Sequence, residues 1–114
     1  MLVLGPAEAG IEAVFRNAGV PVLKDLDLPT VAAVARIASG FVGNDSGVSH
    51  LAAAAGTSGV VLFGPTDPAR WRPIASRREQ QIEIVRGEPI DRVDPHEVAG
   101  VLSKICRAAS NIID

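Results

Sequence analysis

The chain has 114 residues, of which 47% are hydrophobic and 21% charged, a composition typical of one folded domain and unlike that of a disordered segment. Lys and Arg number 11 against 13 Asp and Glu, and the net charge of −2 argues against binding to a nucleic-acid backbone. The single cysteine, Cys106, excludes an internal disulfide. No apolar run reaches the ~18 residues of a membrane span, and residues 1–4 are too short for a signal peptide, so a cytoplasmic location is expected.

Short apolar runs alternate with helical patterns along the chain. The runs predict strands at residues 2–4, 20–23, 41–42, 60–63 and 82–85. The patterns predict helices at 7–18, 29–40 and 46–55, and a last one that Asp94 caps. Residues 64–80 look irregular because they contain three prolines. Alternating strands and helices predict an α/β fold, a Rossmann-like parallel sheet with helices on both faces.

The loop after the third expected strand has the residue types of an anion site. Ser46 and Gly47 fall in the first turn of the next helix, where N–H groups lack partners and the helix dipole is positive. Gly47 would let an anion approach the backbone, and His50 lies one turn further on the same face. The pattern is typical of a phosphate site.

Other functional interpretations fit the residues of this loop less well. No Gly-Lys-Ser/Thr follows, as a P-loop requires, and the glycine spacing does not fit a dinucleotide-binding fingerprint. Ser46 lacks the glycines of a nucleophile elbow, and Asp45, Ser46 and His50 crowd one turn too closely for a catalytic triad. A purely structural alternative stays open, in which Asp45 or Ser46 caps the helix and His50 is packed.

A second unusual loop, Gly64-Pro65-Thr66-Asp67-Pro68, follows the fourth strand and would lie beside the first loop if the two strands are neighbours. Thr66 and Asp67 could bind a polar ligand there. A plain proline-rich turn capped by Asp67 is the alternative.

Together the two loops resemble glycosyltransferase family 9, which contains the ADP-heptose:lipopolysaccharide heptosyltransferases. The resemblance rests on GNDSGVSHLAAA at residues 43–54 and FGPTDPARWRP at residues 63–73. It implies a GT-B fold, in which two Rossmann-like domains face each other across a cleft. Residues 1–114 are similar to the C-terminal, donor-binding domain alone, as a single domain without the acceptor domain.

The resemblance also implies roles for individual residues. The donor diphosphate would lie against Asp45, Ser46, Gly47 and His50, with Gly64, Thr66 and Asp67 in the second loop. Glu8 would contact the ribose, and Leu26 would lie near the adenine. The donor would be an ADP-heptose-like nucleotide sugar and the acceptor an oligosaccharide or lipid-linked sugar of lipopolysaccharide-core type. No cofactor, metal or nucleic acid is expected, and a peripheral position at the inner face of the bacterial inner membrane is compatible with such an acceptor.

The chain departs from the family pattern at its beginning. The acceptor domain with its general base and the first strand of the donor domain, with a basic residue near its end, have no counterpart here. The chain is therefore expected to be a truncated product or a fragment, without a catalytic residue and inactive alone. Residues 2–4 and 41–42 would then either pair directly or leave an exposed sheet edge, which favours a homo-oligomer. A non-catalytic nucleotide- or phosphosugar-binding module is the alternative function, and a sugar-nucleotide epimerase half fits the second loop less well.

The remaining candidates favour structural interpretations. An arginine run could grip an anionic acceptor but is more often a solvated face; it comprises Arg70, Arg72, Arg77 and Arg78. Trp71 is expected to pack its loop rather than stack on a ligand, His96 to be exposed in a first helical turn, and Cys106 to lie in the core.

Overall fold

The computed structural model describes residues 1–113, and the side chains of all of these except residues 6, 7, 9 and 109–113. It divides into two compact units, residues 1–31 and 32–114, with the boundary inside helix α2. Every strand pair is parallel, which confirms the α/β prediction. The strands form two separate sheets, with orders β1-β2 and β3-β4-β5.

The first unit contains β1 (Leu2–Leu4), the 3₁₀ segment η1 (Pro6–Ile11), α1 (Glu12–Asn17) and β2 (Val22–Lys24). The prediction of one helix over 7–18 is wrong, because residues 6–11 form a 3₁₀ segment. Two apolar side chains of this region are exposed: Val14 is 67% exposed and Ile11 43%. Gly19 ends α1 with a φ of +79°, as its position predicted.

Helix α2 (Leu28–Ile37) begins one residue before the expected Pro29. The Asp27 carboxylate accepts a 2.9 Å hydrogen bond from the Thr30 N–H, which occupies one of the unpaired donors of the first turn. Hydrogen bonding with the side chain of Thr30, and then with its N–H, lowers the pKa of Asp27. In the second unit the Thr57 hydroxyl donates to the Ala35 carbonyl near the other end of α2, at 2.5 Å.

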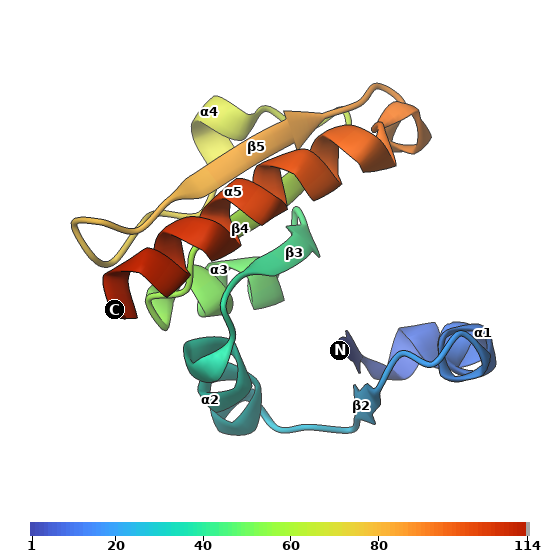
Figure 1. The fold of residues 1–114 in the computed structure, drawn as a ribbon. Helices are drawn as coiled ribbons and strands as arrows, with labels where there is room; N and C mark the ends of the chain where they lie inside the picture. The colour runs from blue at the N-terminus through green and yellow to red at the C-terminus, as the bar shows by residue number, and fades with distance from the viewer. Residues whose placement is uncertain (114) are drawn as a thin grey trace. The chain divides into compact units, whose positions relative to one another are not determined.

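The second unit is a three-stranded sheet of β3 (Phe41–Asn44), β4 (Gly59–Phe63) and β5 (Ile82–Arg86). Its helices are α3 (Gly47–Ala54), the short α4 (Pro68–Trp71) and α5 (Pro95–Ile113), with a 3₁₀ turn η2 (Ile90–Arg92). Figure 1 shows α5 lying along one side of the sheet, with α3 and α4 on the other. The irregular region expected at 64–80 thus contains one short helix. Asp94 caps α5 as predicted, through a 2.9 Å bond from the His96 N–H.

The core of this unit lies on both faces of β4, the central strand. Val61 and Phe63 pack with Ala53 of α3 on one face, while Val60 packs with Ile105 of α5 on the other. The three β4 side chains are fully buried. Burial of such side chains contributes about 1.5–3 kcal/mol each, so β4 fixes the sheet and with it the loops at the ends of the strands.

Candidate functional site

Both candidate loops lie at one edge of the sheet in the second unit. Strands β3 and β4 are parallel neighbours, and Asn44 lies opposite Leu62 in the register. The Asp45 N–H extends this pairing with a 3.1 Å bond to the Leu62 carbonyl. Because the carboxyl ends of neighbouring parallel strands meet at one edge, the loop before α3 and the loop after β4 are adjacent, as the sequence predicted.

The packing of α3 against β3 depends on one close contact. Ser49 of α3 is 2% exposed, and its hydroxyl donates a 2.6 Å hydrogen bond to the carbonyl of Asn44. A Cβ atom added at Gly43 would overlap the Ser49 hydroxyl. Gly43 therefore allows the helix to approach the strand. The sequence did not predict this contact, because Gly43 and Ser49 belong to different elements and each looked like an ordinary member of the loop motif.

The first turn of α3 is open to a ligand. Ser46 occupies the N-cap position with an extended backbone, but its side chain makes no capping hydrogen bond. A Cβ atom at Gly47 would meet no heavy atom within 4 Å, and His50 is exposed on the next turn. The alternative of a capping Ser46 hydroxyl and a packed His50 is therefore wrong. Asp45 is exposed and precedes the N-cap residue, so its side chain also faces solvent.

The second loop is held mainly by its own structure. The Asp67 carboxylate accepts a 3.0 Å hydrogen bond from the Ala69 N–H and caps α4, as the structural alternative predicted. Gly64 is buried, and a Cβ atom there would lie 3.2 Å from the Cβ of Ile90. Thr66 is half-buried in the same loop. Of these residues, Asp67 has an established structural role, and its role toward a ligand stays a prediction.

The two residues assigned to the nucleoside belong to the first unit. Glu8 is exposed, and its carboxylate accepts a 2.7 Å hydrogen bond from the Gly5 N–H, which closes the turn after β1. Leu26 lies in the loop that joins β2 to α2 and is half-buried. Their assignment to ribose and adenine stays a prediction.

The four arginines of residues 70–78 are all exposed, which agrees with the favoured interpretation as a solvated run. The guanidinium of Arg72 donates a 2.6 Å bond to the Ile82 carbonyl, and Arg77 donates to the Gly56 carbonyl at 3.1 Å. Arg70 lies 5.6 Å from the centre of the Trp71 ring. Trp71 is 51% exposed, so the prediction that it packs its loop is wrong. His96 is exposed, as predicted, and Cys106, which was expected in the core, is half-buried in α5.

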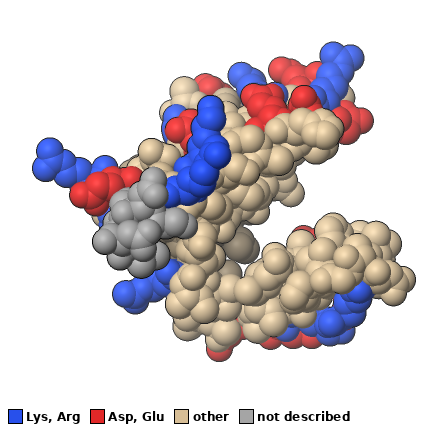
Figure 2. Space-filling model, viewed as in Figure 1, with Lys and Arg blue, Asp and Glu red and all other residues tan. Residues whose placement is uncertain are grey.

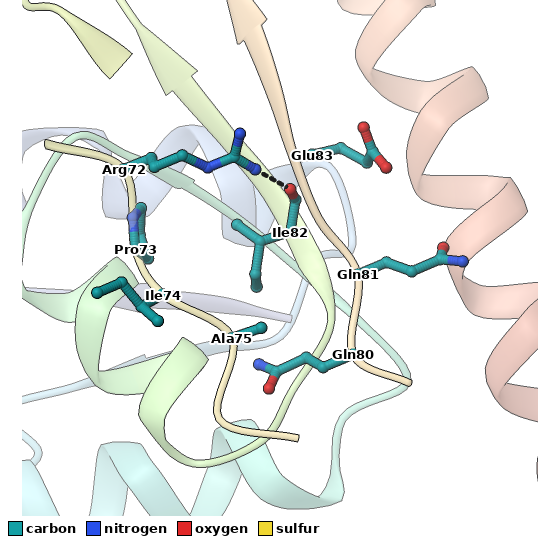
Figure 3. Close-up of a pocket in the computed structure, with 8 residues that line it drawn as sticks. All are labelled: Arg72, Pro73, Ile74, Ala75, Gln80, Gln81, Ile82 and Glu83. Carbon is teal, nitrogen blue, oxygen red and sulfur yellow. Dashed lines mark hydrogen bonds between the residues drawn. The ribbon is translucent and has the colours of Figure 1, made fainter. Parts of the chain in front are cut away.

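Two hollows of the second unit lie away from the candidate loops. One of about 510 Å³ lies beside the amino end of β5, where Arg72 reaches the Ile82 carbonyl (Figure 3). Another, of about 300 Å³, lies near the C-terminal end of α2 and the residues before β4. On the face drawn in Figure 2, acidic and basic side chains are intermixed rather than gathered by sign. In the described part of the chain, no three His, Cys, Asp or Glu side chains converge as metal ligands would.

No helix among residues 1–113 has the length and apolarity needed to cross a membrane.

No curated protein and no solved structure matches the chain. Residues 7–96 match the family described as glycosyltransferase family 9 (heptosyltransferase). This match covers most of the chain and includes both candidate loops. The chain therefore belongs to glycosyltransferase family 9 and carries a domain of that sugar-transferring family.

Proposed function

We propose that this chain binds the nucleotide-sugar donor of a glycosyltransferase, with the donor diphosphate at the first turn of α3. The observation that carries the proposal is the open helix end. The Ser46 side chain makes no capping bond, the space next to Gly47 is empty, and His50 is exposed one turn away. Backbone N–H groups at a helix end, together with the helix dipole, favour a bound phosphate.

This arrangement suits the leaving group of a sugar transfer. Attack at the anomeric carbon proceeds through an oxocarbenium-like state, and negative charge grows on the departing diphosphate. Fixed N–H donors stabilise such charge without having to reorganise during the reaction. The His50 imidazole can add a hydrogen bond to the same phosphate. Our proposal assigns this chain donor binding and leaving-group stabilisation, and assigns no residue of it as nucleophile or general base.

The donor we propose is an ADP-heptose-like sugar, and the acceptor is a lipopolysaccharide-core-like oligosaccharide. Membership of the heptosyltransferase family supports this choice. A binding module without transferase activity would bind ADP equally well. Release of ADP from an ADP-sugar, dependent on added acceptor, separates the two functions.

Calorimetric titration with ADP tests the site. Gly47→Val should weaken binding more than 10-fold, because the valine side chain would occupy the empty space through which the phosphate approaches. Gly100→Val is the matched control, since Gly100 is also a helical glycine with no heavy atom within 4 Å of its Cβ position. His50→Ala should cost about 1–2 kcal/mol, as expected for one lost hydrogen bond to a charged group. Equal ADP affinities of the Gly47→Val and Gly100→Val proteins would refute the assignment.

A further inference from the structure

Arg86 ends β5 at the same edge of the sheet as the two candidate loops. Side chains alternate between the faces of a strand, so Arg86 shares a face with Ile82 and Ile84. Both isoleucines pack with the core cluster that includes Ala53 of α3. Arg86 therefore lies on the α3 face of the sheet and, in the register, opposite Phe63 at the end of β4.

The guanidinium of Arg86 is only loosely held. Its Nε donates a long, 3.4 Å hydrogen bond to the carbonyl of Gly64, in the second candidate loop. Its Nη2 lies 4.0 Å from the Glu88 carboxylate, and these side chains are 48% and 67% exposed. An exposed ion pair of this length contributes little to stability. The guanidinium is thus directed toward the end of β4 while most of its donors stay available.

This position lies close to the proposed phosphate site. Strand β5 lies two strands from β3, about 9.6 Å across the sheet at about 4.8 Å per strand, and the Arg86 side chain shortens this gap by reaching the Gly64 carbonyl after β4. The charged residues in these loops and in the short helices that follow them are Asp45, Asp67, Arg70, Glu88, Asp91 and Arg92; Asp45 is exposed and Asp67 caps α4. Asn44, Phe63 and Arg86 are the last residues of β3, β4 and β5, and Arg86 is the one of these three that carries a positive charge.

We infer that Arg86 binds the sugar-proximal phosphate of the donor diphosphate, while the first turn of α3 holds the phosphate next to the nucleoside. This inference rests on the proposed function. A guanidinium offers several donors in one plane and suits two phosphate oxygens. It would neutralise the phosphate that becomes terminal when the bond between sugar and oxygen breaks and the electron pair remains on that oxygen. Arg86 thereby helps to stabilise the leaving group.

Calorimetric titration with ADP and with AMP separates the two phosphate positions, because AMP lacks the second phosphate. Arg86→Gln should weaken ADP binding about 10-fold, the effect of losing a charge-assisted hydrogen bond, and change AMP binding less than about 2-fold. Arg86→Lys should retain part of the ADP affinity. Glu88→Gln is the matched control, and should leave ADP binding unchanged or slightly stronger. Melting curves of each variant check that it is folded.

The outcomes distinguish this inference from the proposed function. ADP affinity that is unchanged in Arg86→Gln, or ADP and AMP affinities that fall equally, would overturn the role of Arg86. The α3 site would still stand if Gly47→Val abolished binding. If the unaltered chain bound neither nucleotide, both proposals would fail.

Discussion

Replacing Gly43 by alanine should destabilise the second unit by forcing α3 away from β3. The new Cβ atom would overlap the Ser49 hydroxyl, which is buried and bonded to the Asn44 carbonyl. Overpacking of this kind costs about 1–3 kcal/mol of unfolding free energy. The displaced helix end should also lower ADP affinity, although Gly43 itself contacts no ligand in the proposed complex.

A double-mutant cycle isolates the contact. Ser49→Ala removes the hydroxyl and one hydrogen bond, at a cost of about 1 kcal/mol. In the Gly43→Ala/Ser49→Ala protein, the methyl group at position 43 would face the Cβ of residue 49, which lies 3.4 Å away in the present structure. The second substitution should therefore relieve most of the strain of the first. The double variant should be little less stable than Ser49→Ala alone, a coupling of about 1–2 kcal/mol.

Urea unfolding followed by far-ultraviolet circular dichroism measures these free energies, and fluorescence of the single tryptophan, Trp71, reports on the same unit. Coincident transitions would justify a two-state treatment. Two results would refute this reasoning. One is a free energy of unfolding for Gly43→Ala within about 0.5 kcal/mol of that of the unaltered chain, the usual range for surface substitutions. The other is a double variant whose loss of stability equals the sum of the losses in the two single variants.

Two further predictions concern groups away from the site. Gln80 is 9% exposed; its side-chain amide donates to the Ala53 and Thr57 carbonyls at 2.8 Å, and its Oε1 accepts from the N–H groups of Ser76 and Arg77 at 2.7 and 3.1 Å. At about 1 kcal/mol for each of these four bonds, less where a freed group finds water, Gln80→Leu should cost about 2–4 kcal/mol in the same urea assay. Gln81→Leu, at an exposed neighbour, is its control, and equal stabilities would contradict the prediction. Hydrogen bonds from Arg16 and then Lys24 lower the pKa of Glu12 below its ordinary 4.5. The stabilisation of the first unit by Glu12 should therefore be complete above pH 4.5 and be lost as the pH falls through the lowered pKa. Carboxyl NMR titration should show this pKa rising in Arg16→Gln; a pKa insensitive to that change would contradict the assigned cause.

The sequence predicted the elements whose signals are local. An uninterrupted apolar run marked β4 as a strand, and the capping residue Asp94 marked the start of α5. Both predictions depend on nearest neighbours in the chain, and both are confirmed. The helix predicted over 7–18 is wrong because its apparent apolar face depends on a partner surface that the pattern alone does not specify: Val14 is left exposed, and no residue of α1 is buried.

The open first turn of α3 was predictable only in part. Ser46 is a good capping residue, so its position before a helix predicted equally well a capped end and a free one. Only the structure shows that the hydroxyl does not make this bond. Arg86 could not be predicted as a ligand-binding residue either, since an arginine at the end of an apolar strand is common. It became a candidate only because β4 and β5 are parallel neighbours, so that their carboxyl ends lie together.

Three glycines near the candidate loops allow close contacts between elements, because they have no side chain. Gly43 admits Ser49 of α3, Gly59 admits the ring of Phe41 across the β3–β4 pair, and Gly64 lies under Ile90. A hydrophobic pattern treats such positions as gaps, because a glycine contributes no apolar area of its own. In the folded chain each one fixes how closely two elements approach. In the proposed complex, the first turn of α3 and the guanidinium of Arg86 on β5 bind the same diphosphate. A shift of a few tenths of an ångström at these glycines should therefore alter donor binding without changing any atom that touches the donor.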